Sequence, residues 1–354
     1  MKILQKYFTI NLMVTTLIAL FGLVSLFSFF SIIDQMADTG RGNYTVPEAL
    51  LYVLLTTPRL AYELFPIAAV IGSMATLGML AHHNELVVIR TSGVSKGELA
   101  IILTKAALLL VILSIIFGEM IAPISGEAAQ QRRSFAMTEQ ISMRTRNGYW
   151  ARDGGSFINI RKILPGNRVE DVYIYEFDQN DKLRTSIHAQ DASYSQQHWL
   201  LHDIEQTSIS NEKISIQRLR QAEWPSSLEP EIINFVMVQP QYLSLFGLLK
   251  YIDYLRQNDQ ETAPYEQALW KKLIKPFSIC TMVLLAILLV RCESRFAVEG
   301  QRIFFGMLIG IVFHICDQIS GHLGMVYTLP AYLSVTTPTV LLMGTVVYLL
   351  RNSD

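Results

Sequence analysis

The sequence predicts an α-helical membrane protein with six transmembrane helices, three on each side of an inserted all-β domain. Two observations lead to this fold class. The chain of 354 residues is 51% hydrophobic and 17% charged, whereas about a quarter of an average soluble domain is charged. The charges are also unevenly placed, because they are scarce towards both ends and concentrated in the middle. The high hydrophobicity and a net charge of −1 exclude a disordered chain.

Three apolar runs in the first third of the chain are long enough to cross a bilayer, which takes about 20 mostly apolar residues. The first, Phe8 to Ile33, carries no charge and is too long for the apolar core of a signal peptide, about 7–15 residues. The second, Leu64 to Ala81, has small residues at helical spacing, which favour close helix packing in lipid. The third, Leu99 to Ala122, is interrupted by Lys105 and Glu119 near its ends, where long side chains reach an interface.

The polar middle of the chain, from about residue 126 to 267, predicts an antiparallel all-β unit, either a sandwich or an open barrel. Turn residues separate short runs rich in β-branched and aromatic residues: Phe157 to Ile163, Val172 to Phe177, His198 to His202 and Lys213 to Leu219. Acidic residues outnumber basic ones here, which argues against a nucleic-acid-binding patch. Residues Leu243 to Arg256 predict a short amphipathic helix leading back to the membrane.

Three more apolar runs complete the chain: Leu273 to Val290, Ile303 to Ile319 and Pro330 to Leu350. We therefore divide the chain into residues 1–125 with the first three spans, residues 126–265 with the β domain, and residues 266–354 with the last three spans.

The Lys/Arg bias of the short loops predicts both termini in the cytoplasm and the β domain on the far side of the membrane. Basic residues flank the termini and occupy the loops after the second and fourth spans, whereas the loop Ser320 to Leu329 carries none. The cluster Lys271, Lys272 and Lys275, at the far-side entry of the fourth span, opposes this rule and needs its own explanation.

No catalytic residue, bound cofactor or metal site is expected. The sequence has no P-loop, H-E-x-x-H, G-x-S-x-G or dinucleotide-binding motif. His314 and Asp317, three residues apart in the fifth span, could touch. Such a pair in lipid is either a functional group or an ordinary helix–helix hydrogen bond, and the sequence leaves both open.

The loop between the second and third spans predicts a short cytoplasmic helix near residues 84–93. Asn84 suits an N-cap, Glu85 the first turn and Gly93 the end of the helix. Leu86 to Ile89 make it apolar around much of its girth. Such a helix either docks in a partner's groove or lies on the membrane surface, and periodicity does not decide between them.

The segment GMLAHHNELVVIRTSGVS, residues Gly78 to Ser95, resembles the coupling segment of the YjgP/YjgQ family, the lipopolysaccharide export permeases LptF and LptG. Further segments resemble the LptG branch more closely: Ile33 to Met36, Gly118 to Pro123, Gly148 to Gly154 and Asp317 to Ile319. The near alternative is the paralogous LptF-type permease. More distant alternatives are a non-transporting periplasmic sensor or scaffold and an intramembrane hydrolase.

The resemblance implies a permease subunit that extracts lipopolysaccharide from the Gram-negative inner membrane and passes it to a periplasmic bridge. It implies a heterodimer with an LptF-type permease on an LptB-type ATPase dimer, which would bind ATP and Mg. LptC would place its own helix near the first span, and LptA would continue the bridge. The β insert would resemble a periplasmic jellyroll.

The resemblance also assigns roles to individual residues. The ATPase contact would involve Glu85, Leu86, Val88, Ile89 and Arg90. The basic rim for the lipid phosphates, which suit guanidinium groups, would involve Arg59, Arg132, Arg133, Arg41 and Lys271. The cavity for the acyl chains would involve Phe27, Phe30, Leu64, Phe65, Met307 and His314. The chain departs from the family's pattern where relatives often carry basic residues, having Ser31, Ala37, Asp38 and Gln130.

Overall fold

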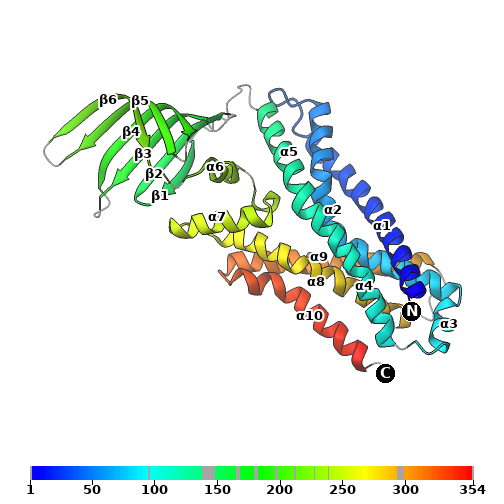
Figure 1. The fold of residues 1–354 in the computed structure, drawn as a ribbon. Coiled ribbons are helices and arrows are strands. Elements are labelled where there is room, and N and C mark those ends of the chain that lie inside the picture. The colour runs from blue at the N-terminus through cyan, green and yellow to red at the C-terminus, as the bar shows by residue number, and fades with distance from the viewer. Residues whose placement is uncertain are drawn as a thin grey trace.

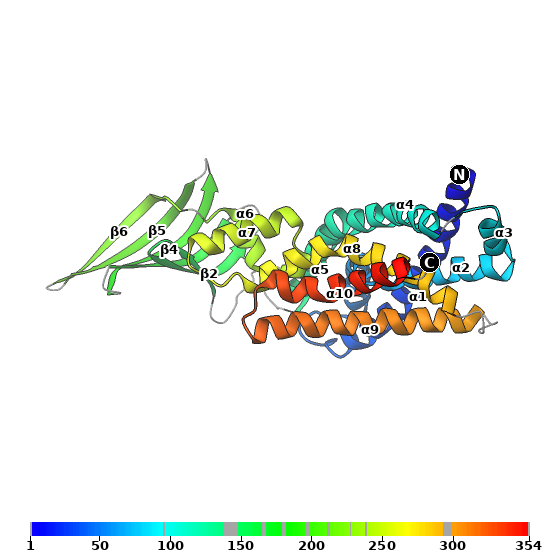
Figure 2. The ribbon, with the colours of Figure 1, turned by 90° about the horizontal axis from the view of Figure 1, so that it is seen from below.

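A computed structural model describes residues 2–94, 96–137, 148–164, 168–178, 182–195, 198–210, 213–226, 228–237, 239–292 and 299–352. The molecule is elongated, with a helical body at one end and an antiparallel sheet at the other (Figures 1 and 2). Both marked chain ends and the short helix α3 (Glu85–Thr91) lie at the end far from the sheet.

Within the described residues, six helical segments are long and apolar enough to cross a membrane, judged by length and composition. They are formed by α1 (Lys2–Met36), α2 (Val46–His82), α4 (Lys96–Ile115) with its continuation, α8 (Ala263–Cys292), α9 (Glu299–Val326) and α10 (Ala331–Asn352). A π-helical turn, η1 (Ile116–Ile121), joins α4 to α5 (Ala122–Met137). The predicted three-plus-three arrangement is thus confirmed.

The second helix begins much earlier than the apolar run predicts, at Val46 rather than near Leu64. Pro47 occupies its first turn, where a fixed φ suits a helix and a missing N–H costs nothing. Pro58 lies inside the helix, and neighbouring helices allow such residues in membrane segments.

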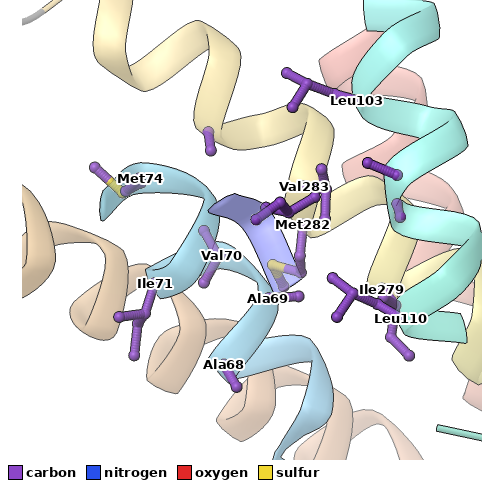
Figure 3. Close-up of a cluster of buried hydrophobic side chains, with 14 of the residues drawn as sticks. Ala68, Ala69, Val70, Ile71, Met74, Leu103, Leu110, Ile279, Met282 and Val283 are labelled. Atoms are coloured by element: carbon purple, nitrogen blue, oxygen red, sulfur yellow. The ribbon is translucent and has the colours of Figure 1, made fainter. Parts of the chain in front are cut away.

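Helix α2 is the central helix of the body, and every residue from Leu64 to Met74 is buried. Figure 3 shows its side chains among those of α4 and α8, with the labelled residues Ala68, Ala69, Val70, Ile71, Met74, Leu103, Leu110, Ile279, Met282 and Val283. Helix α2 packs closely on α1 at Gly72. A Cβ added to Gly72 would collide with Thr16 of α1. Next to it, the Thr15 hydroxyl lies 2.7 Å from that of Thr76. Small residues at such crossings let helix backbones approach in lipid.

Replacing Gly72 by valine should therefore separate α1 from α2. Overpacking of this kind costs about 1–3 kcal/mol, so we expect a lower thermal unfolding midpoint in detergent. Gly22→Val is the matched control, because nothing lies within 4 Å of a Cβ added to Gly22 of α1. Equal midpoints for the two variants would contradict this packing.

The inserted domain is an antiparallel sheet, as predicted, and its described strands pair in the order β1-β2-β3-β4-β5-β6. The strands are β1 (Tyr149–Asp153), β2 (Ser156–Leu164), β3 (Arg168–Phe177), β4 (Leu183–Ser195), β5 (His198–Ile209) and β6 (Ile214–Trp224). The described strands form one open sheet rather than the two sheets of a sandwich. The predicted turn at residues 165–167 lies outside the described residues.

One face of the sheet, which we call the inner face, packs against α6 (Pro230–Met237) and α7 (Leu245–Gln257). Trp199 is buried there, and its indole N–H donates to the Leu228 carbonyl at 2.7 Å. The Tyr254 hydroxyl donates to the Arg152 carbonyl at 2.8 Å. Burial raises the pKa of Tyr254 to about 12, so this donor stays protonated at neutral pH. Helix α7 corresponds to the predicted amphipathic helix and begins after Ser244, whose hydroxyl accepts from the Gly247 N–H at 3.1 Å.

Candidate functional site

A polar pocket of about 340 Å³ opens between α2, α8, α9 and the short 3₁₀ helix η2 (Pro240–Tyr242). We call it the polar pocket. It is lined by Arg59, Tyr62, Glu63, Pro240, Gln241, Pro264, Gln267, Ala268, Lys271, Lys272, Lys275, His314, Asp317, Gln318 and Met325. Ionisable groups are rare in spanning segments and mark substrate or ion pathways, which makes this pocket the leading candidate site.

A second pocket, of about 200 Å³, lies between α1 and α2 and shares Arg59 and Glu63 with the first. Its other lining residues include Ser31, Asp34 and Tyr242. A smaller hollow of about 50 Å³ connects Glu63 with Lys275 and His314. Arg59 and Glu63 therefore form a shared wall between two polar spaces.

The Arg59 side chain contacts Glu63 and Tyr242, but one of its hydrogen-bond donors has no partner among the described residues. Its terminal nitrogen bonds Glu63 at 2.7 Å, and its guanidinium carbon lies 4.3 Å from the centre of the Tyr242 ring. Within the described part of the chain, the buried Nε of Arg59 has no hydrogen-bond partner. A buried donor without a partner costs about 1–3 kcal/mol, and binding of an ion or ligand is one explanation of such a group. Arg59 is thus positioned to donate to an anion.

The lysines of α8 are held by the protein. Lys272 is 7% exposed and pairs with Glu119 of η1 at 2.6 Å. Lys275 donates to the Glu63 carbonyl at 3.2 Å, and its Nζ lies 5.2 Å from the centre of the Tyr62 ring. Lys271 lines both the polar pocket and the smaller hollow. Lys272 and Lys275 thus each have partners within the helical body at this end of α8.

His314 and Asp317 both line the polar pocket and the hollow beneath it. They face Glu63, Lys271 and Lys275 across this space. The pair predicted from spacing therefore belongs to a larger charged cluster shared by α2, α8 and α9.

The other predicted rim residues lie elsewhere. Arg41 and Arg133 each bond Asp38 at 2.8 Å, and the guanidinium carbon of Arg133 lies 5.1 Å from the centre of the Tyr52 ring. The buried Nε of Arg133 also lacks a hydrogen-bond partner among the described residues. Arg132 is exposed. The structure therefore brings Arg59 together with Lys271, and Arg41 together with Arg133.

The predicted ATPase-contact residues lie on α3. Val88 is 64% exposed, and Ile89 packs against the core of the helical body. Glu85 accepts a hydrogen bond from the Tyr7 hydroxyl of α1 at 3.0 Å. The side chains of Leu86 and Arg90 lie outside the described part of the structure. The Asn84 carbonyl accepts from the N–H of Val87 at 3.1 Å, but its φ of 57° differs from the extended N-cap that the sequence predicts.

The predicted acyl-chain residues differ in exposure. Phe27 and Phe30 of α1 are 40% and 58% exposed. Leu64 and Phe65 are packed in the core at 3% and 0%, and Met307 is partly buried against that core. The two α1 residues are therefore open at the surface of the helical body, whereas Leu64 and Phe65 face neighbouring helices.

Glu63, Tyr242 and the pairing of Glu119 were not predicted from the sequence. Arg59 and Glu63 are four residues apart in a long apolar helix, a spacing that favours an ion pair, so this signal was available. The contact of Tyr242 with Arg59 joins distant parts of the chain and has no local signal.

In sequence, the chain is similar to known permeases over almost its whole length. The family described as the lipopolysaccharide export system permease LptF/LptG matches residues 6–352. The lipopolysaccharide export system permease protein LptG of Haemophilus influenzae is 31% identical over 351 residues, which cover 99% of this chain and 98% of that protein. The protein of that name from Escherichia coli strain K12 is 32% identical over 340 residues, which cover 95% and 94%.

Proposed function

The chain belongs to the lipopolysaccharide export system permease family LptF/LptG, and we propose its function on that basis. It is a multi-pass inner-membrane protein and a transporter subunit rather than an enzyme. In our proposal it is the LptG-type permease of an ABC transporter that extracts lipopolysaccharide from the inner membrane. ATP hydrolysis in a partner subunit would drive this extraction, so ATP and Mg would bind the partner and this chain would bind no cofactor.

The observation that carries the proposal is the polar pocket. Lipopolysaccharide is an anionic amphiphile, and a site for it needs cations next to an apolar surface. Arg59 and Lys271 line the pocket, and the Nε of Arg59 is an unsatisfied donor within the described residues. Arginine forks suit phosphate oxygens. Phe27 and Phe30 add exposed apolar surface on α1, where the acyl chains would lie.

The proposed orientation puts both termini and α3 in the cytoplasm and the sheet domain in the periplasm. The marked chain ends and α3 lie together at the end far from the sheet (Figure 2). In this orientation Val87 and Val88, 56% and 64% exposed on α3, face an ATPase, and the sheet faces the periplasmic bridge.

The proposed partners are an LptF-type permease, an LptB-type ATPase dimer, LptC beside α1, and LptA. Exposed apolar side chains along α1 and α9 supply surface for neighbouring helices; they include Ile18, Phe21, Phe29, Phe304, Val312 and Ile315. The second candidate is the paralogous LptF-type subunit, since the matched family covers both.

Affinity purification of the chain from its native membrane in mild detergent, with mass spectrometry, tests the proposal. We expect a P-loop ATPase, a second six-span permease and bound lipopolysaccharide. The sequence of the second permease distinguishes the two paralogues. Recovery of the chain alone, even after crosslinking near Glu85, would overturn the proposal in favour of a sensor or scaffold.

Replacing Arg59 by methionine should remove most of the lipopolysaccharide that co-purifies. Arg59→Met deletes the cation and its unsatisfied donor while keeping an apolar stem, and hydrogen bonds to charged groups contribute about 1.5–3 kcal/mol. We expect at least a tenfold loss of bound lipid per permease, measured by quantitative mass spectrometry. Arg351→Met, at an exposed position in the last turn of α10, is the control, and an equal loss from both variants would contradict the pocket's role.

A further inference from the structure

A line of positions with interrupted pairing crosses the sheet from β2 to β6. Pairing is interrupted at one position on each of β2 to β6. Arg161 and Asp171 lie between the pairs Ile160↔Val172 and Lys162↔Glu170, and the line continues through the unpaired positions Gln190, Asp203 and Arg220. We call these five residues the crease.

The crease changes which side chains face inward. On β3 the buried residues Val169 and Val172 are three apart, and on β5 the same holds for Leu201 and Ile204. A regular strand alternates with a period of two, so one residue is inserted in each strand. Asp171 and Asp203 take positive φ values of 55° and 47°, which Asp tolerates better than most residues.

A groove of about 660 Å³ runs along the outer side of the crease, within the range of small-molecule sites, about 300–1,000 Å³. We call it the crease groove. It is lined by Asp171, His188, Gln190, Asp203, Ile204, Glu205, Arg218, Leu219 and Arg220. Carboxylates, an amide, an imidazole and guanidinium groups therefore alternate along one surface.

Contacts between aromatic rings hold the side chains along one edge of the crease groove in place. His188 stacks on Tyr173 with ring centres 4.4 Å apart, and its Nε2 lies 3.4 Å from Asp171. The guanidinium carbon of Arg161 lies 4.6 Å from the centre of the Tyr173 ring. The aromatic row continues to Trp150, which is 56% exposed. Side chains held in this way lose little entropy when they bind a ligand.

The crease groove carries both acidic and basic side chains, and this limits the kinds of ligand that it can bind. An isolated phosphate would face the carboxylates of Asp171, Asp203 and Glu205. No cluster of His, Cys, Asp or Glu in the part of the chain that the structure describes could hold a metal. A ligand with many neighbouring hydroxyls uses donors and acceptors together, and its C–H faces suit exposed aromatic rings such as Trp150.

We propose that the crease groove binds an oligosaccharide, namely the sugar portion of the glycolipid whose export is proposed above. The inference rests on that function but concerns a separate site, because the polar pocket lies among the membrane helices. A glycolipid leaving the membrane keeps its sugars in water, where the outer face of a periplasmic sheet can contact them.

The test uses the full chain in nanodiscs and the water-soluble oligosaccharide released from lipopolysaccharide by mild acid. Binding is measured by calorimetry and by saturation-transfer NMR. We expect wild-type binding, about tenfold weaker binding by Gln190→Ala and by Asp203→Asn, and no change in Ile214→Ala. Gln190 is exposed, Asn also tolerates the positive φ of Asp203, and Ile214 is 71% exposed on β6 away from the groove.

Two results would overturn the inference. One is no oligosaccharide binding by the wild type, and the other is equal weakening in the Ile214 control. Photocrosslinking from position 190 to a polypeptide instead of a sugar would assign the groove to a protein partner and also refute it. Lipopolysaccharide export is assayed in the same variants, so export without oligosaccharide binding rejects this inference alone. Oligosaccharide binding without export by the wild type rejects the proposed function.

Discussion

A permease carrying Glu85→Arg is expected to lose the proposed ATPase partner during purification. Glu85 opens α3, next to the exposed Val87 and Val88. Reversing a charge at an interface costs several kcal/mol when it creates a like-charge contact. We expect at least a tenfold fall in the ATPase recovered per permease, measured by quantitative mass spectrometry of the purified complex.

Tyr7→Phe is the matched control for Glu85→Arg. It removes the 3.0 Å hydrogen bond from α1 to Glu85 without changing the charge on α3. If Glu85 acts through a partner, this variant keeps its ATPase. If Glu85 only ties α3 to α1, Tyr7→Phe loses the ATPase as well, and the proposed contact is wrong.

The second large effect is expected where η1, α7 and α8 meet. One oxygen of Glu119 accepts from Lys272 at 2.6 Å, and the other accepts from the Leu245 N–H at the start of α7 at 2.6 Å. Lys272 also donates to the Gly118 carbonyl of the π-helical turn at 3.1 Å. Glu119 thus connects two membrane helices to the helix that packs on the sheet.

Glu119→Lys should be strongly destabilising, because it places two cations together and removes the acceptor of Leu245. Breaking a buried ion pair costs about 3–5 kcal/mol. The double variant Glu119→Lys with Lys272→Glu should recover much of the thermal unfolding midpoint by restoring the pair. Lys250→Met is the control, because Lys250 pairs with Glu229 and Glu231 at the surface, where ion pairs contribute about 0–1 kcal/mol. Failure of the double variant to recover would show that the pair does not govern this junction.

The sequence predicts the overall fold because its signals are local. The lengths of the apolar runs predict the six spans, and runs rich in β-branched and aromatic residues predict β2, β3, β5 and β6. Strands β1 and β4 were not predicted, β4 because its run from Leu183 to Ser195 is mostly polar or small. Cross-strand pairing, rather than propensity, makes it a strand.

The candidate site is only partly predictable. Arg59 was predicted from the family resemblance, and the lysines of α8 from their conflict with the positive-inside rule. Tyr242, which contacts Arg59, and Glu119, which pairs with Lys272, come from remote parts of the chain. Glu119 and Lys272 are separated by 153 positions. The crease has no local signal either, because an interrupted pairing position becomes visible only when the strands are in register.

The most direct test of the central claim, that the polar pocket receives the exported lipid, is photocrosslinking in living cells. A photoreactive residue at Gln318, which is exposed and lines the pocket, should crosslink lipopolysaccharide. The same residue at Val347, 53% exposed on α10, should not. The Gln318 signal should fall at least tenfold when Arg59→Met is added. Equal labelling from both positions, or no labelling from Gln318 in a permease that still exports lipid, would contradict the account.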